Sequence, residues 1–146
     1  MDIRRGFQFD EPNYFISWGI DENTLASLFK DTELNCITTG YFTTTCKSLN
    51  GLNCRVGFHF EPRENGHLLE LEFFRTNYDD LQKSFDEFQY YFEKKFGQPT
   101  YFRAGTEGFN DYLWVFDNVS INHVISNRYG PEEHMRIISS SPSVPY

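Results

Sequence analysis

The sequence predicts an α+β fold in which an antiparallel sheet of about six to eight strands carries two helices. Three observations support this prediction. Residues 78–96 have the period and both end signals of an amphipathic helix, Asn50-Gly51 joins two β-rich stretches, and alternating apolar and polar residues recur on both sides of the helix.

The N-terminal segment predicts two short strands and a short helix. Residues 6–9 and 14–20 have the composition of strands, and the period then changes to that of a helix over residues 22–31. Asp21 or Asn23 is suited to cap this helix. Its apolar residues follow at spacings of three and four: Leu25, Leu28 and Phe29.

A β-hairpin is predicted around Asn50-Gly51, which joins residues 35–49 to residues 52–61. With a two-residue loop, Leu49 pairs with Leu52, and a slip of one residue would exchange the two faces of the strand. The remaining predicted pairs are Lys47 with Cys54, Thr45 with Val56, Thr43 with Phe58, Phe42 with His59, and Tyr41 with Phe60.

The next strand, residues 67–75, alternates leucine and phenylalanine with Glu70 and Glu72. Two carboxylates at this spacing are a candidate catalytic pair. Alternate glutamates on a strand more commonly form a solvated face, in which they pair with arginines of neighbouring strands.

The long helix, residues 78–96, has clear signals at both ends. Asn77 is the predicted N-cap, acidic residues fill the first turn and lysines fill the last, and Gly97 is placed to stop the helix. An apolar stripe along one side predicts packing against a sheet. The stripe consists of Leu81, Phe85, Phe88, Phe92 and Phe96.

The C-terminal part predicts further strands, at 100–104, 112–116, 119–127 and 134–139, with a turn at residues 129–133. A two-residue loop at Asp117-Asn118 would place Trp114 opposite Ile121 and Tyr112 opposite His123.

The chain of 146 residues is expected to form a single domain over residues 1–139, followed by a polar tail at 140–146. A helix followed by about three strands occurs at 22–75 and again at 78–139. Two interpretations stay open: a duplicated α-β-β-β unit, or one continuous sheet with both helices on one face.

The formal net charge of −8 argues against a nucleic-acid partner and against binding to anionic membranes, and it favours a basic protein partner. Neither a signal peptide nor a long apolar run is visible, and the three cysteines form no metal or disulfide pattern. We therefore expect reduced thiols and a cytoplasmic location.

The motifs of phosphate loops, metalloproteases and nucleophile elbows are absent from the sequence, so we expect no cofactor, no metal and no catalytic residue. His59 and His67 flank one turn and are the candidate metal pair, without a third ligand in view. Cys46 is expected on the same sheet face as His59, but small buried cysteines are commoner than nucleophiles.

The leading hypothesis is a non-enzymatic protein-binding module, similar in style to bacterial immunity proteins and secretion chaperones. Its candidate partner-binding residues lie opposite the apolar stripe of the long helix: Asp86, Tyr90 and Glu93. The alternative is a small-molecule binder or enzyme with a pocket between the long helix and the sheet, covered by the loop at 105–111. A homodimer formed through a sheet edge is a third possibility.

Overall fold

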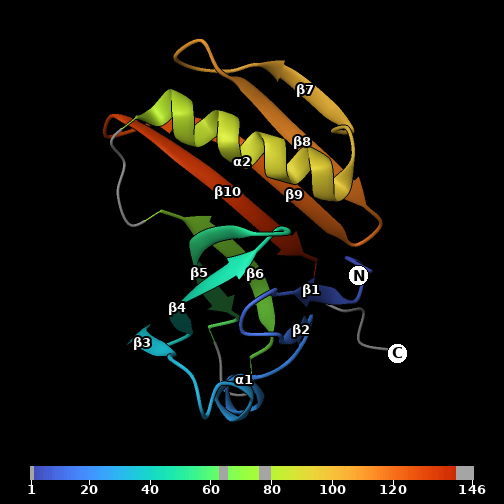
Figure 1. The fold of residues 1–146 in the computed structure, drawn as a ribbon, viewed down its shortest axis with the longest axis vertical. Coiled ribbons are helices and arrows are strands. Elements are labelled where there is room, and N and C mark those ends of the chain that lie inside the picture. Colours follow the sequence, from blue (N-terminus) through green and yellow to red (C-terminus); the bar gives the residue numbers. More distant parts are fainter. Residues whose placement is uncertain (1, 63–65, 76–79, 141–146) are drawn as a thin grey trace.

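The computed structural model describes residues 2–62, 66–75 and 80–140. Two helices and ten strands form the predicted α+β fold (Figure 1). The elements are β1 (Gly6–Gln8), β2 (Phe15–Ser17), α1 (Glu22–Leu28), β3 (Asn35–Thr38), β4 (Tyr41–Ser48), β5 (Leu52–Phe60), β6 (Leu68–Phe74), α2 (Leu81–Phe96), β7 (Tyr101–Ala104), β8 (Asn110–Phe116), β9 (Val119–Asn127) and β10 (Pro131–Ser139).

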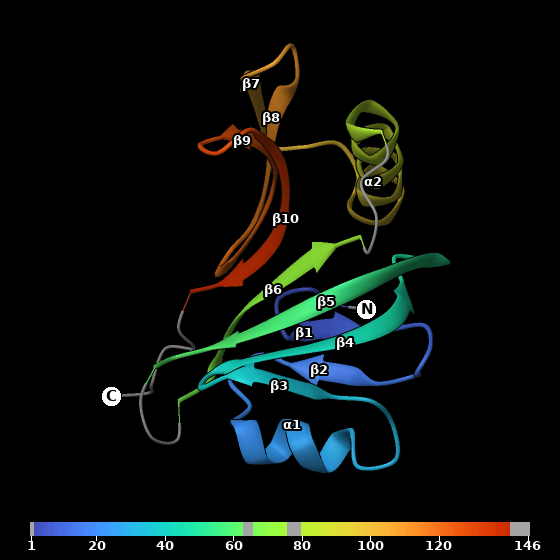
Figure 2. The ribbon, with the colours of Figure 1, turned by 90° about the vertical axis from the view of Figure 1, so that its left-hand side faces the viewer.

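Eight of the strands form one antiparallel sheet in the order β3-β4-β5-β6-β10-β9-β8-β7, and β1 pairs only with β2. Each half of the chain therefore supplies a helix and a meander of four strands, and the meanders meet at β6 and β10. The structure therefore has one continuous sheet with both helices on one face, and each half repeats the order of a helix and four strands rather than the predicted three or so. The sheet twists strongly from end to end, as Figures 1 and 2 show.

Both helices lie on the same face of this sheet, as the ring contacts show. In the first half, Phe29 at the end of α1 packs against Phe58 of β5, with ring centroids 5.7 Å apart. In the second half, Phe92 of α2 packs against Phe73 of β6, with ring centroids 6.0 Å apart. A single hydrophobic cluster spans both halves and includes the β1–β2 hairpin.

Helix α2 agrees with its sequence signals except at its start. Phe85, Phe88 and Phe92 are buried as predicted. The helix begins at Leu81, and the side chain of Asp80 caps it by accepting from the Lys83 N–H. Asn77, the predicted cap, lies outside the described residues. At the other end Gly97 has φ 82°, and its carbonyl accepts a hydrogen bond from Trp114 Nε1 at 2.8 Å.

Helix α1 is shorter than predicted. It begins at Glu22 with Asp21 as its cap and ends at Leu28 rather than at residue 31, because the Phe29 N–H already closes the last turn. Phe29 then turns into the core.

The predicted register of the Asn50-Gly51 hairpin is wrong by one residue. Ser48 pairs with Leu52, and Cys46 pairs with Cys54. The loop has three residues because Leu49, Asn50 and Gly51 all take positive φ. Leu49 buries its side chain, and the shift keeps Lys47 out of the core. By contrast, the β8–β9 hairpin has its predicted register: Trp114 faces Ile121, and Tyr112 faces His123.

Candidate functional site: the open sheet face

The sheet face opposite α1 and α2 is the candidate functional site, and we call it the open face. Along β9 and β10, buried side chains that face the helices alternate with half-buried ones on the open face. Figure 2 shows α2 on one side of the second half of the sheet, and both helices of the described chain lie on that side. Among the described residues, no helix covers the other side.

One row of side chains crosses the whole open face. Residues directly opposite each other in antiparallel strands point to the same face, so the pairing of the strands identifies this row. From β3 to β7 it consists of Asn35, Thr43, Gly57, Glu72, Arg136, Asn122, Leu113 and Tyr101. The row is polar in its first half and becomes apolar toward β7.

The centre of the open face holds an ionic cluster. His59 Nε2 lies 3.1 Å from Glu72 Oε1 and 3.7 Å from Glu70 Oε2. Arg136 reaches the same two carboxylates, at 3.4 Å from Glu72 and 3.7 Å from Glu70. The two glutamates therefore pair with a strand arginine as expected, and they pair with a histidine as well.

The two glutamates of this cluster titrate differently because their partners differ. The hydrogen bond from His59 lowers the pKa of Glu72 below its ordinary value, against the opposing effect of burial. Burial raises the pKa of Glu70, and Arg136 offsets only part of that rise. The pKa values of the two carboxylates are thus shifted in opposite directions.

Tyr41 covers one side of the cluster. Its ring stacks on His59 with centroids 4.5 Å apart and an interplanar angle of 23°. The ring lies over Gly57, where a Cβ would come within 2.7 Å of Tyr41. Gly57 thus leaves the space that lets Tyr41 hold the imidazole plane in place.

The β7 end of the open face is apolar and exposed. Tyr101 is 63% exposed and Val115 is 43% exposed. Next to them is a groove of about 460 Å³. Its lining residues are Tyr101, Phe102, Arg103, Asp111, Tyr112, Leu113, Asn122 and Val124. Large exposed apolar side chains beside a groove are typical of protein interfaces.

The predicted partner-binding residues lie elsewhere, on the outward side of α2. Tyr90 is 57% exposed, and Lys94 Nζ donates to its hydroxyl at 3.2 Å. Asp86 accepts from Gln82, and Glu93 accepts from Gln89. All three residues thus have partners within α2, and the structure places them on the side of the sheet away from the open face.

The expected cysteine and histidine neighbours do not come together. Cys46 faces the core and lies 4.0 Å from Cys54, Sγ to Sγ, whereas His59 is on the open face. The expectation failed because the hairpin register is shifted by one residue. His67 Nδ1 contacts the Gly19 carbonyl, so it does not share a site with His59.

A second polar cluster is buried between α2 and the sheet. His123 Nε2 lies 2.6 Å from Glu133 Oε2, and both side chains are fully buried. Ser84 Oγ donates to the other oxygen of Glu133 at 2.6 Å, and Gln89 Oε1 lies 2.8 Å from His123 Nδ1. These contacts join α2 to β9 and β10, so their main effect is to fix the helix on the sheet.

Sequence reasoning missed this cluster because residues 129–133 were predicted as a turn. Strand β10 begins at Pro131, which puts Glu133 inside the strand and next to His123. The sequence signal that could have indicated the buried cluster was His123, an isolated histidine in a run of alternating apolar residues.

The free energy of unfolding is expected to depend on pH through the protonation of His123. Burial lowers its pKa, with Glu133 acting against the shift. The unfolded chain, where the imidazole pKa is about 6.5, binds more protons in acid than the folded chain does. Stability contributed by neutral His123 is thus present above about pH 6.5 and lost as the pH falls below it.

Urea unfolding at several pH values between about 7.5 and 5.5 would measure this loss. The fall in the free energy of unfolding is expected to be smaller in His123→Gln, which cannot titrate. Equal pH slopes in the two proteins would show that His123 does not contribute to the pH dependence.

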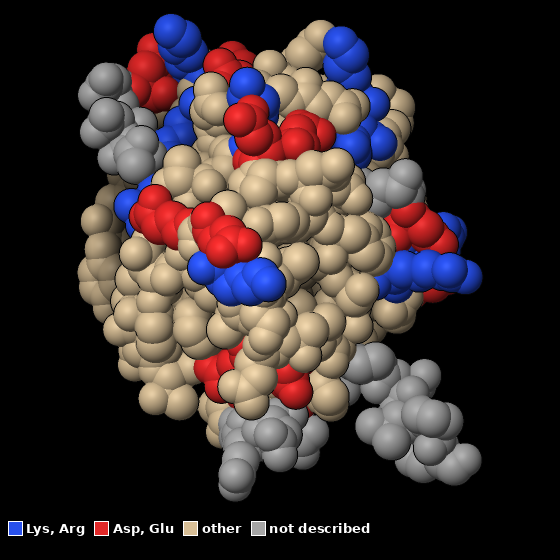
Figure 3. All heavy atoms as spheres, turned by 60° about the horizontal axis from the view of Figure 1, so that its bottom comes forward, with Lys and Arg blue, Asp and Glu red and all other residues tan. Residues whose placement is uncertain are grey.

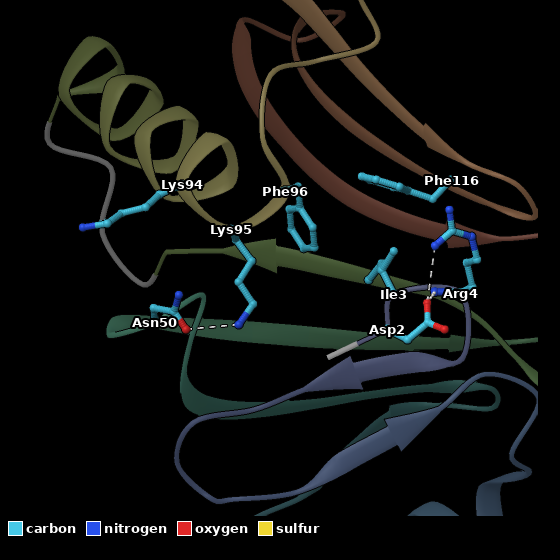
Figure 4. Close-up of a pocket in the computed structure, with 8 residues that line it drawn as sticks. All are labelled: Asp2, Ile3, Arg4, Asn50, Lys94, Lys95, Phe96 and Phe116. Atoms are coloured by element: carbon cyan, nitrogen blue, oxygen red, sulfur yellow. Dashed lines mark hydrogen bonds and ion pairs between the residues drawn. The ribbon is translucent and has the colours of Figure 1, made fainter.

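The space between α2 and the sheet, where a ligand pocket was one hypothesis, is filled by side chains in the described residues. Phe85 stacks on His123 at 4.0 Å, and Phe109 of the predicted lid packs on Phe85 at 4.8 Å. A cavity of about 410 Å³ lies instead at the C-terminal end of α2 (Figure 4). Arg4 there pairs with Asp117, and Lys95 Nζ donates to Asn50 at 3.1 Å.

Comparison with known proteins identifies no family. No family model matches this chain, and no curated protein matches it. A similar solved structure is that of a DUF4309 family protein (YjgB) from Bacillus subtilis subsp. subtilis str. 168. It is 12% identical, with 82% of this chain and 78% of that chain covered and a TM-score of 0.41.

The described part of the chain also has no helix with the length and apolar character needed to cross a bilayer.

Proposed function

We propose that this chain is a non-enzymatic protein-binding module and that the open face receives its partner. The observation that carries the proposal is the composition of this face. Exposed apolar side chains gather toward β7, an ionic cluster lies at the centre, and Asn122 stands between Arg136 and Leu113 in the row. The apolar β7 end would form the core of the contact and the ionic cluster would lie at its edge, because charged groups belong to the rim of protein interfaces.

The proposed partner is a basic protein. This is the partner we expect for a module similar in style to immunity proteins and secretion chaperones. The net charge of −8 would steer a basic partner toward the molecule over long range. At short range the charges of the open face do not form one acidic patch, because Arg136 pairs with Glu70 and Glu72. Figure 3 shows acidic and basic side chains next to each other on the side that carries α1. Affinity would therefore come from the apolar contacts, and charge would mainly set the association rate.

We also propose a cytoplasmic location for the protein. All three cysteines are free thiols, and free thiols are the usual state in reducing compartments.

Leu113→Glu is expected to weaken partner binding at least about tenfold, because it puts a charge into the apolar part of the open face. A tagged chain would first recover the partner at low and at high salt, and the purified pair would then be titrated by calorimetry. Tyr90→Ala, on the outward side of α2, is the matched control and should leave the affinity unchanged.

Three results would count against the proposal. One is a reconstituted complex that Leu113→Glu does not weaken although the variant is folded. Another is a complex that Tyr90→Ala abolishes, which would move the binding surface to α2. The third is the failure of every recovered protein to form a saturable complex with the purified chain.

A further inference from the structure

Three side chains of metal-ligating types converge on the open face. His59 of β5 lies directly opposite Glu70 of β6, and Glu72 is two residues further along β6, so all three point to the same side. One nitrogen and one carboxylate oxygen from each glutamate lie within 4.8 Å of one another. The ligands stand on two paired strands in the middle of the sheet, which holds their spacing more tightly than loops would.

The spacing of these atoms fits a small tetrahedral cation. Zinc binds nitrogen and carboxylate oxygen at about 2.0–2.2 Å, so neighbouring ligand atoms in a tetrahedron are about 3.4 Å apart. His59 Nε2 lies 3.1 Å from Glu72 Oε1 and 3.7 Å from Glu70 Oε2. A bound ion would need only small side-chain adjustments.

Arg136 is compatible with an ion at this position. It contacts Glu72 through Oε2, whereas Oε1 of the same carboxylate faces His59. One oxygen can therefore ligate while the other accepts from the guanidinium, an arrangement that commonly orients metal-binding carboxylates. Glu70 presents the same oxygen to His59 and to Arg136, so Arg136 would have to move slightly away from it.

The surroundings also fix the direction of the imidazole. The Tyr41 ring stacks on His59 and leaves Nε2 pointing at the carboxylates. The side chains of His59, Glu70 and Glu72 are 36%, 17% and 22% exposed, so the cluster remains reachable from solvent. Three protein ligands and a reachable fourth position make an open zinc site rather than a closed structural one.

We propose that His59, Glu70 and Glu72 form a zinc site on the open face. The sequence predicted no metal site, because His59 and His67 were the candidate pair and no third ligand was in view. A mixed nitrogen and oxygen ligand set with an imidazole favours zinc over magnesium and calcium, which bind through oxygen alone. The site is independent of the proposed partner, because it uses only residues of this chain.

Calorimetric titration of the untagged, chelator-treated protein with zinc chloride at pH 7.5 tests the proposal. The expected result is saturable binding of one ion per chain, with no comparable binding of magnesium or calcium. His59→Gln and Glu72→Gln should each weaken zinc binding at least about tenfold, as the loss of a ligand or of its support does in metal sites.

Glu132→Gln is the matched control, because Glu132 lies on β10 close to His134 of the same face, at 3.8 Å, and outside the cluster. It should leave zinc binding unchanged. Circular dichroism of each variant would confirm that it is folded. The proposal is overturned if the wild-type chain shows no saturable zinc binding. It is also overturned if Glu132→Gln weakens the binding while His59→Gln and Glu72→Gln do not.

Discussion

Replacing Glu133 with alanine is expected to lower the free energy of unfolding by at least about 2 kcal/mol, because each buried donor that loses its partner costs about 1–3 kcal/mol. Glu133 accepts from Ser84 and contacts His123, and none of these side chains can reach solvent readily. The variant would leave Ser84 and His123 buried without this partner. Denaturant unfolding followed by circular dichroism measures the loss.

Glu132→Ala is the control for this variant, because the neighbouring residue is exposed. It should change the free energy of unfolding by no more than about 0.5 kcal/mol. A Glu133→Ala protein as stable as Glu132→Ala would mean that the buried contacts do not fix α2 on the sheet.

Phe92→Ala is expected to cost about 3–5 kcal/mol, because it leaves a cavity in the core. Phe92 is fully buried and joins three strands to α2. Its ring lies 6.0 Å from Phe73 of β6, 5.8 Å from Trp114 of β8 and 5.6 Å from His123 of β9. Thermal and denaturant unfolding of the purified variant would give the size of the effect.

Tyr90→Ala, on the same helix but on its outward side, is the comparison. It should alter stability by less than about 0.5 kcal/mol, as surface substitutions usually do. If both variants lost the same stability, burial of the Phe92 ring would not explain its loss, and the position of α2 in the core would be in doubt. Helix propensity cannot be responsible, because alanine is the better helix former at both positions.

Local signals predicted most elements of the fold, but not the start of β10 at Pro131. The Phe stripe and Gly97 defined α2 and its end, and the Asp117-Asn118 loop gave the correct register of β8 and β9. The Asn50-Gly51 hairpin failed because Leu49 takes positive φ, which a leucine seldom does. A Lys47 pointing into the core was the sign that the predicted register was wrong.

The contacts of the open face could not be predicted from local sequence signals. Its central contact joins Arg136 to Glu72, 64 residues apart, and depends on β6 pairing with β10. The pairing of the two meanders could not be chosen from sequence patterns. The nearest prediction was that strand arginines pair with Glu70 and Glu72, which Arg136 confirms.

There are two alternative binding surfaces for the partner. One is the open face, and the other is formed by Asp86, Tyr90 and Glu93 on α2. The ring of Tyr90 is exposed, so a partner could reach the surface on α2. The two surfaces lie on opposite sides of the sheet, so one partner of ordinary size would contact one surface and not the other.

Photo-crosslinking tests the claim that the open face is the binding surface most directly. A photoreactive amino acid would replace Leu113 in one variant and Tyr90 in another, and each variant would be irradiated with the purified partner. We expect a covalent adduct from position 113 and none from position 90. An adduct from position 90 alone would contradict the claim.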